Sequence, residues 1–497
     1  MSSLLRRGRL KPAKKDAISF ISSVKDDEKI IKQIVDVNKA HIVMLIEEGI
    51  IGREIGGRIL QALDGLERRV EIKPEHEDAH VAIEEAVVNA AGEEAGGNLN
   101  LAKSRNDQVA TAIRMRLRLE IIKTAGLITD LQEAMLKKAE ENIGAIIPGY
   151  THLQPAQPIT FAHYILAQFD ALHRDLSRLK EAYSRINLSP MGAGALATTS
   201  LPISREKTAE LLGFNGIIEN SLDAVSTRDF LLETLAVLSI MAVDMSRMAE
   251  DIIVWSTMEF GLIELPDDYA FTSSIMPQKK NPDVLEVIRA RMSLILGDFT
   301  SSAIMLKALP TGYNLDFQEA TPILWRAIEN IQRCLKILTK VILNLKVHPE
   351  AVYRPELSFM AATELANMLV KDYGVPFRTA HRIVGAAVKN LIDKGMSLKD
   401  LTPKLLADVS SEIIGSQIHV KKEDLADIID ISGCVESCSV RGGPSRKEAE
   451  RMLRERKALL ADSKMWIREK KDRLEAAEEM LKRRVKELSK SIPNRNV

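Results

Sequence analysis

The stretch from Leu222 to Phe260 reads LDAVSTRDFLLETLAVLSIMAVDMSRMAEDIIVWSTMEF and contains neither proline nor glycine. Because these two residues are the ones that most often interrupt helices, the stretch could form one helix about 58 Å long at ~1.5 Å per residue. Apolar residues occupy most sides of its middle part. A helix that is apolar nearly all round is buried on all sides, inside one subunit or between several. The segment therefore predicts the core helix of a bundle.

Further helices are expected on both sides of this segment. Proline-free stretches rich in Ala, Leu, Glu, Lys and Arg predict helices from about Ala110 to Asn142 and from about Phe161 to Ile186. The charged end, Ser445 to Lys490, predicts one or two solvated helices, with an interaction arm as the alternative. Strand-like alternation of Val, Ile and Thr is scarce, and aromatic residues make up only 4% of the chain, which disfavours a β-sandwich.

We therefore predict an all-α fold in three parts. A central bundle of long helices would occupy residues 110–358. Smaller helical domains would precede it, over residues 1–109, and follow it, over residues 359–497.

Composition excludes several classes of protein. The 497 residues carry 69 Lys and Arg against 69 Asp and Glu, so there is no bulk electrostatic reason to bind nucleic acid or an anionic membrane. No run approaches the ~18 apolar residues of a membrane span, and no apolar region of a signal peptide follows Arg6, Arg7 and Arg9. We expect a cytoplasmic protein.

The three cysteines are Cys334, Cys434 and Cys438. An odd number in so long a chain argues against a disulfide framework and for a reducing compartment. Cys434 and Cys438 are interpreted as small buried thiols, because no second Cys or His pair lies near them to complete a metal site. We therefore expect no metal ion.

Three polar segments interrupt the predicted helices. Ser104-Arg105-Asn106-Asp107-Gln108 would begin a helix, either as an N-cap completed by Asp107 or as an anion site formed with free backbone N–H groups. Thr151–Pro158, THLQPAQP, would hold His152 on a loop made rigid by two prolines. Thr272–Asp283, TSSIMPQKKNPD, is either a charged surface turn or a site whose hydroxyl, ammonium and amide groups suit a carboxylate substrate.

The third segment contains Ser-Ser-x-Met-Pro-x-Lys-x-Asn-Pro, which resembles the signature of the fumarase/aspartase superfamily, whose members release fumarate from a succinyl group. Gln278 and Lys280 within it are similar to argininosuccinate lyases, where fumarases typically have Gly and Val. Further segments resemble that family in the same order along the chain, over roughly residues 20 to 460: Ser104–Val109, Thr151–Pro158, Glu219–Phe230, Ser246–Asp251 and Gly374–His381.

This resemblance implies a fold, an assembly and a reaction. Members of the family are all-α, homotetrameric and metal-free, with active sites shared between subunits, and they need no cofactor. They split 2-(Nω-L-arginino)succinate into L-arginine and fumarate, the last step of arginine biosynthesis. The alternatives are another fumarate-releasing lyase, such as one similar to adenylosuccinate lyase, and a crystallin-like structural relative. Retention of His152, Ser273, Lys279 and Asn281 favours an enzyme.

The resemblance also assigns roles to residues. His152 and Ser273 would be the acid and base of the elimination, in an order that the sequence does not give, and Glu286 would raise the basicity of His152. Lys279 and Asn281 would stabilise the carbanion, whose negative oxygens require fixed donors. The expected substrate contacts also include Ser23, Ser104, Arg105, Asn106, Thr151, Tyr313 and Gln318.

Four positions depart from the usual family pattern. Thr272 replaces a Gly, and Leu101-Ala102-Lys103 replaces Thr-Gly-Arg. Arg7-Gly8-Arg9-Leu10 only loosely resembles Gly-Gly-Arg-Phe. Thr321 stands where the family usually has a Lys that helps to hold a substrate carboxylate. We therefore expect substrate binding to differ from the family pattern at this position.

Overall fold

The computed structural model describes residues 13–66, 70, 72 and 76–490. The Arg7–Leu10 stretch lies outside the described residues. Within the described part of the chain, none of the helices combines the length and apolar character that crossing a membrane requires.

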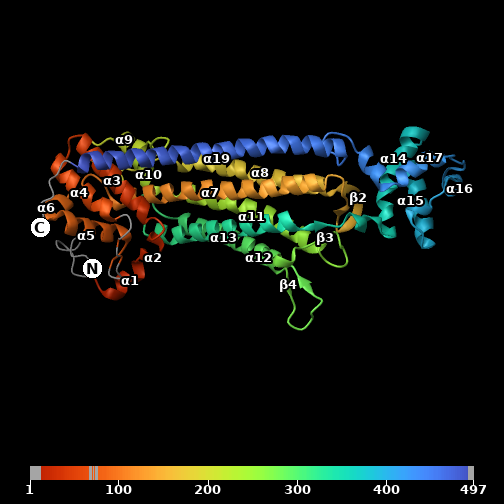
Figure 1. The fold of residues 1–497 in the computed structure, drawn as a ribbon, viewed down its shortest axis with the longest axis horizontal. Helices are drawn as coiled ribbons and strands as arrows, with labels where there is room; N and C mark the ends of the chain where they lie inside the picture. Colours follow the sequence, from red (N-terminus) through yellow and green to blue (C-terminus); the bar gives the residue numbers. More distant parts are fainter. Residues whose placement is uncertain (1–12, 67–69, 71, 73–75, 491–497) are drawn as a thin grey trace.

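Long helices packed side by side form the central bundle (Figure 1). A single large hydrophobic core runs through the bundle, with Phe161, Phe169 and Phe230 among its largest fully buried side chains. The all-α prediction is therefore confirmed. The bundle helices are α7 (Arg105–Glu141), α8 (Phe161–Ile186), α11 (Asp229–Trp255), α12 (Asp283–Leu306) and α13 (Asp316–Asn344).

Two of the predicted helices agree closely with the structure. The helix predicted from Phe161 to Ile186 is α8 with the same bounds, capped by the Thr160 hydroxyl, which accepts the His163 N–H. The helix predicted from Ala110 to Asn142 is α7, which begins earlier, at Arg105. The difference arises because the polar Ser104–Gln108 segment forms the first turn of the helix.

The prediction of one unbroken helix from Leu222 to Phe260 is wrong. The chain forms α10 (Ser221–Ser226), leaves the helical conformation at Thr227, and starts α11 at Asp229. The break follows from the Arg228 side chain, which donates Nη1 hydrogen bonds to the carbonyl oxygens of Val225 and Thr227. These oxygens are the ones that a continuous helix would pair with later N–H groups.

The bundle keeps an exposed apolar surface in the single subunit. Ile240 and Val243 on α11 are each 43% exposed, so α11 is not buried on all sides within one chain. Val287, Leu294 and Ile304 on α12 are also exposed. α11 and α12 pack against each other, so these exposed apolar side chains lie on two neighbouring helices.

Small helices gather at the two ends of the bundle (Figure 1). At one end lie α1 (Lys15–Ile21), α2 (Val24–Asp27), α3 (Ile31–Glu47), α4 (Arg53–Leu66), α5 (Ala79–Ala91), α6 (Glu93–Gly96) and α9 (Arg205–Leu211). At the other lie α14 (Ala362–Tyr373), α15 (Phe377–Asp393), α16 (Pro403–Ile414), α17 (Lys422–Ile429) and α18 (Ile431–Ser437), which share a separate hydrophobic cluster.

The charged C-terminal segment forms one continuous helix, α19 (Arg446–Ser489), which returns along the whole bundle (Figure 1). Its charged side faces solvent, as expected, and its other side buries an apolar seam. The seam repeats every seven residues, which is the spacing of helices that pack lengthwise: Leu453, Leu460, Ile467, Leu474 and Leu481. The segment packs against α3, α4 and α7 of its own chain.

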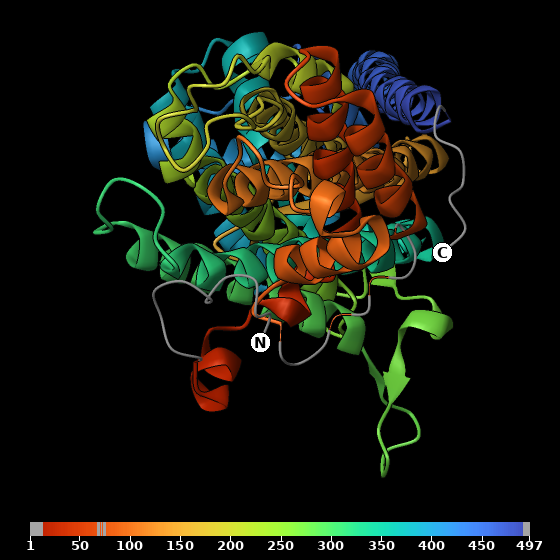
Figure 2. The same cartoon turned by 90° about the vertical axis from the view of Figure 1, so that its left-hand side faces the viewer.

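The sequence did not predict the three short antiparallel strand pairs. β1 (Ile146–Thr151) pairs with β2 (Gln154–Thr160), β3 (Ile263–Glu264) with β6 (Lys346–Val347), and β4 (Phe271–Thr272) with β5 (Lys280–Asn281). Proline and glycine in the first pair hide the alternation that identifies strands, and each strand of the other two pairs has only two residues. The first pair turns the chain between α7 and α8, and the third protrudes from the side of the bundle (Figure 2).

We predict that Gly213→Ala will destabilise the docking of α19. Gly213 has φ +73°, and an added Cβ would lie 2.9 Å from the Cβ of Ala477 on α19. The left-handed backbone costs about 1–2 kcal/mol for a residue with a side chain, and overpacking adds about 1–3 kcal/mol. The matched control is Gly415→Ala, which has the same φ of +73° and no atom within 4 Å of the added Cβ. Thermal unfolding should show the larger loss for Gly213→Ala, and equal losses would contradict this account.

Candidate active site

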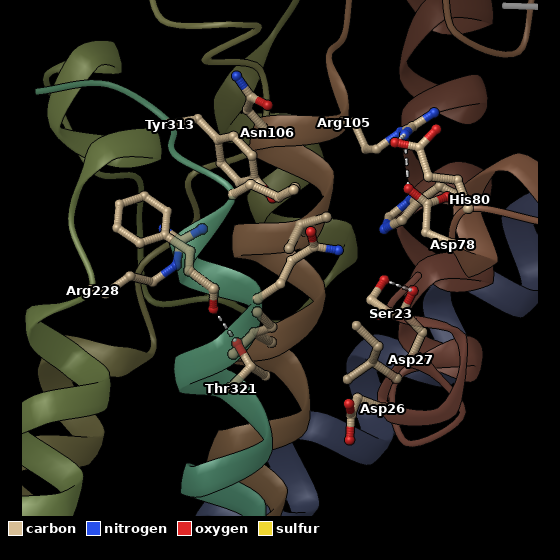
Figure 3. Close-up of a pocket in the computed structure, with 17 residues that line it drawn as sticks. Ser23, Asp26, Asp27, Asp78, His80, Arg105, Asn106, Arg228, Tyr313 and Thr321 are labelled. Atoms are coloured by element: carbon tan, nitrogen blue, oxygen red, sulfur yellow. Dashed lines mark hydrogen bonds and ion pairs between the residues drawn. The ribbon is translucent and has the colours of Figure 1, made fainter. Parts of the chain in front are cut away.

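A pocket of about 270 Å³ lies where the start of α7 meets α2, α5 and the start of α13 (Figure 3). Five of the predicted substrate-contact residues line it, although they come from well-separated parts of the sequence. These residues are Ser23, Arg105, Asn106, Tyr313 and Gln318. The pocket is therefore the candidate binding site that this chain contributes.

The first turn of α7 is fixed by a capping box. The Ser104 hydroxyl accepts the Asn106 N–H at 3.3 Å, and the Asp107 carboxylate accepts the Ser104 N–H at 3.1 Å, so the N-cap interpretation is confirmed. Asp107 also accepts the N–H groups of Gly192 and Gly194. Burial raises the pKa of Asp107 to about 6. Ser104 and Asp107 thus hold the helix start against a second loop and orient the residues that follow.

Arg105 and Asn106 differ in their freedom to bind a ligand. Arg105 forms an ion pair with Asp78 at 2.8 Å and lies 3.8 Å from Glu77, so its charge is already balanced. The Asn106 side-chain amide donates to the Ala195 carbonyl oxygen at 3.1 Å, which leaves its oxygen available. An anion site at this helix start would therefore depend more on Asn106 and backbone groups than on Arg105.

Acidic residues that the sequence analysis did not single out form one wall of the pocket (Figure 3). The Asp27 carboxylate accepts the Ser23 hydroxyl at 2.9 Å and the Ala79 N–H at 3.1 Å. Burial raises the pKa of Asp27 to about 6, and burial also raises the pKa of Asp26. Both lie on α2, a helix of four residues whose place beside α5 could not be deduced from its own sequence.

The opposite wall contains a cation that was also missed. Arg228 lines the pocket together with Tyr313, and its guanidinium stacks on the Phe317 ring, with its carbon 4.3 Å from the ring centroid. Thr321 lines the pocket one turn further along α13 and donates its hydroxyl hydrogen bond to the Phe317 carbonyl oxygen. The signal that could have revealed Arg228 is its place within Glu219–Phe230, one of the segments that resemble the family.

His152 lies in the tight turn of the β1–β2 hairpin. The Thr151–Pro158 segment, expected to be a loop made rigid by two prolines, contains a turn of two residues, His152 and Leu153, flanked by the Thr151–Gln154 pair. Both turn residues have left-handed backbones, with φ +56° and +58°, the pattern of a type I′ turn. A left-handed backbone costs energy in any residue other than glycine. Residues strained in this way are often found at functional sites. His152 and Thr151 are exposed in the single subunit.

Ser273 and Lys279 lie on the loop of the protruding β4–β5 hairpin (Figures 1 and 2). The Ser273 hydroxyl accepts the N–H groups of Ile275 and Met276 at 3.3 and 3.2 Å, which folds the loop back on itself. Lys279 is exposed, and Asn281 is half-buried in β5. Glu286 is exposed in the first turn of α12.

The hairpin also anchors Lys280 and accommodates Thr272. Lys280 donates to Glu264 at 3.0 Å and Asp267 at 2.6 Å, which explains a basic residue at this point of the signature. Thr272 pairs with Lys280 in the short sheet, so the Thr in place of Gly fits the extended backbone here.

The remaining departure lies behind the pocket. Ala102 has φ +62°, a left-handed conformation that the usual Gly adopts without strain. Lys103 is half-buried and its Nζ donates to the Asn38 side-chain oxygen. Burial lowers the pKa of Lys103 to about 7.

Within one chain, the predicted site residues form three separate groups. The pocket lies at the start of α7, whereas His152 lies beyond its other end, and 37 helical residues span about 55 Å. The Ser273 loop protrudes away from both (Figure 1). In the described chain, no hydrogen bond or ion pair joins Glu286 to His152. One subunit therefore does not bring all of the predicted site residues together.

All three cysteines are free thiols. Cys434 is buried, as expected, whereas Cys438 is half-buried. Among the described residues, no group of three or more His, Cys, Asp or Glu side chains is arranged to hold a metal ion.

Comparison with known proteins identifies the class. Residues 23–297 match the family described as lyase, and residues 359–436 match the argininosuccinate lyase C-terminal family. The chain is similar to the argininosuccinate lyase of Methanosarcina barkeri (strain Fusaro / DSM 804), with 40% identity over 97% of this chain and 98% of the relative. It is 43% identical to that of Methanothrix thermoacetophila, covering 95% of this chain and 97% of the relative.

Solved structures support the same class. A crystal structure of EDDS lyase in complex with formate matches with a TM-score of 0.88 and 28% identity, covering 99% of each chain. A class II fumarase from Schistosoma mansoni shares the fold, with a TM-score of 0.70 and 17% identity over 87% of this chain and 97% of the fumarase. The fold and the sequence together define a lyase of the fumarase/aspartase superfamily. Within it, the chain belongs to the argininosuccinate lyase family.

We predict that Asp27 makes the stability of the protein depend on pH. Because burial raises its pKa from 3.8 to about 6, the folded state binds the proton more tightly than the unfolded state between these values. The free energy of unfolding should therefore fall as the pH rises from about 4 to 6, by up to about 3 kcal/mol from this group. Asp27→Asn should remove that part, as measured by urea unfolding of both proteins across this range. A difference between them that is constant with pH would contradict the assignment.

Proposed function

We propose that this chain cleaves 2-(Nω-L-arginino)succinate into L-arginine and fumarate, the last step of arginine biosynthesis, in the cytoplasm. The observation that carries the proposal is the pocket at the start of α7. There the fold gathers Ser23, Asn106, Tyr313 and Gln318, residues that the family resemblance had marked as substrate contacts. The similarity to argininosuccinate lyases, 40% and 43% identity over nearly the whole chain, supports the same substrate.

The reaction needs a base, an acid and a stabilised carbanion. The base removes a proton from the carbon next to a succinyl carboxylate, the electrons move onto that carboxylate, and the C–N bond breaks as the acid protonates the leaving nitrogen. We assign the acid and base roles to His152 and Ser273, with Glu286 raising the basicity of His152. Lys279 and Asn281 would stabilise the two negative oxygens of the carbanion.

We also propose that the enzyme is a homotetramer in which each active site combines loops from different subunits. Two observations support this assembly. The pocket and the His152 turn lie at opposite ends of α7 and are too far apart to meet within one chain. The Ser273 loop protrudes from the side of the bundle (Figure 1). Apolar side chains such as Ile240 and Val243 on α11 and Leu294 on α12 remain exposed in the single chain, and burying them would favour association.

A second candidate is a fumarate-releasing lyase that acts on a different succinyl-amine. Two observations favour this second candidate. Thr321 lacks the positive charge that the family usually has at this point in the pocket. A solved EDDS lyase also matches the structure over 99% of both chains. Substrate preference decides between the two candidates.

We predict that argininosuccinate will give the fastest fumarate release among argininosuccinate, EDDS, adenylosuccinate, aspartate and malate. The increase of ultraviolet absorbance by fumarate measures each reaction with the same purified protein. Faster release from EDDS, adenylosuccinate or aspartate would overturn the assignment. An absence of fumarate from every compound would favour a structural protein.

We predict that two inactive variants will restore each other's activity. His152→Asn and Ser273→Ala should each lose at least about 10²-fold in kcat, because each removes a proton-transfer group. If the two loops come from different subunits, random mixing should give about one site in four with both loops intact.

The variants should therefore be unfolded together, refolded, and assayed beside each parent refolded alone. Co-purification through two different tags shows whether the assemblies are mixed. Mixed assemblies as inactive as the parents would contradict shared sites. A Ser273→Ala enzyme that keeps most of its kcat would contradict the role of Ser273.

A further inference from the structure

Arg228 is a buried cation with unfilled hydrogen-bonding capacity. Arg228 is only 4% exposed. Its Nη1 donates to the backbone carbonyl oxygens of Val225 and Thr227, at 3.4 and 2.7 Å. Its Nε and Nη2 are shielded from solvent and have no hydrogen-bond partner. Among the described residues, no carboxylate forms an ion pair with it.

This arrangement is unfavourable for a protein without a ligand. Burial lowers the pKa of Arg228 to about 10, so the guanidinium remains charged at neutral pH. Removing a charge from water without a counter-ion costs several kcal/mol, and unpaired N–H groups add to that cost. Such a group is expected where an anion completes the site.

The position of Arg228 points to the substrate pocket. It lines the pocket on the wall opposite Asp26 and Asp27 (Figure 3). The other arginine that lines the pocket, Arg105, is already paired with Asp78. Arg228 is thus the pocket arginine whose charge is not balanced within the described chain.

Phe317 connects Arg228 to Thr321, one of the four departures from the family pattern. The ring of Phe317 lies against the Arg228 guanidinium, and its carbonyl oxygen accepts the Thr321 hydroxyl at 3.0 Å. Arg228 and Thr321 therefore lie on the same wall. Thr321 occupies the place where the family usually has a Lys that holds a substrate carboxylate.

We propose that Arg228 binds a carboxylate group of the substrate and supplies the positive charge that Thr321 does not. A carboxylate could accept from Nε and Nη2 together, in the two-pronged geometry that arginine favours. Because both atoms lie beneath the pocket surface, binding includes a movement of the Phe317 or Tyr313 side chain. The inference rests on the proposed function, since it assigns a role within the same pocket.

The test uses two pairs of ligands that differ only in a carboxylate or its charge. L-Arginine is compared with agmatine, which lacks the carboxylate, and fumarate with fumaramide, its neutral amide. Dissociation constants are measured by calorimetry with the full-length protein and its Arg228→Gln variant. We expect the variant to bind at least one carboxylate ligand at least about 30-fold more weakly, while its neutral or carboxylate-free counterpart changes by less than about two-fold.

Arg114→Gln is the matched control. Arg114 is also a buried arginine whose pKa is lowered to about 10, and it stacks on the Phe230 ring, but it is not among the residues that line the pocket. Its Nη1 donates to the carbonyl oxygens of Arg185 and Ile186. It should therefore reproduce any loss of stability without a selective loss of carboxylate binding.

Two further variants keep the test decisive if Arg228→Gln folds poorly. Arg228→Lys keeps the charge and should bind carboxylates more tightly than Arg228→Gln. The double variant Arg228→Gln/Thr321→Lys returns a cation to the same wall and should recover part of the affinity. Equal weakening of all four ligands, or of none, would overturn the proposal. A wild-type protein that releases no fumarate from argininosuccinate would instead overturn the proposed function.

Discussion

The uninterrupted length of α7 is the constraint on which the arrangement of the site depends. The capping box of Ser104 and Asp107 fixes where the helix begins, and no proline interrupts it before Pro148. The pocket therefore forms at one end of a rod about 55 Å long, and the His152 turn forms beyond the other. A rigid helix of this length cannot bend to bring them together, so a site that uses both would need more than one chain.

The residues proposed as acid and base, which lie outside the pocket, are held on short hairpins. His152 lies in a two-residue turn in which both residues have left-handed backbones, and the strand pairing on either side keeps them there. Ser273 lies on a loop closed by its own hydroxyl and anchored where Lys280 meets Glu264. The β4–β5 hairpin protrudes from the bundle (Figure 1), and the turn of the β1–β2 hairpin is exposed beyond the end of α7. These placements would suit the proposed sharing of sites between subunits.

Charge is divided across the pocket. Asp26 and Asp27 lie on one wall, and Arg228 lies on the other beside the Phe317 ring. On both walls, burial disfavours the charged form of the side chain. It therefore raises the pKa values of Asp26 and Asp27 and lowers the pKa of Arg228. A substrate with a cationic end and carboxylate groups would match this division. If Arg228 binds a carboxylate as proposed, this division would let the pocket tolerate Thr321 in place of a Lys.

The sequence by itself determined the helical class, the bounds of α8, the capping box of α7 and the family. These features depend on local patterns: helix periodicity, proline placement, and motifs read within a few residues. Only the tertiary structure decided the break before α11, because the buried Arg228 side chain there takes carbonyl oxygens that a helix would use. It also decided that Asp27 and Arg228 face the same pocket, since residues so far apart in sequence carry no local signal of their meeting. Packing brings them together, and packing depends on the whole chain.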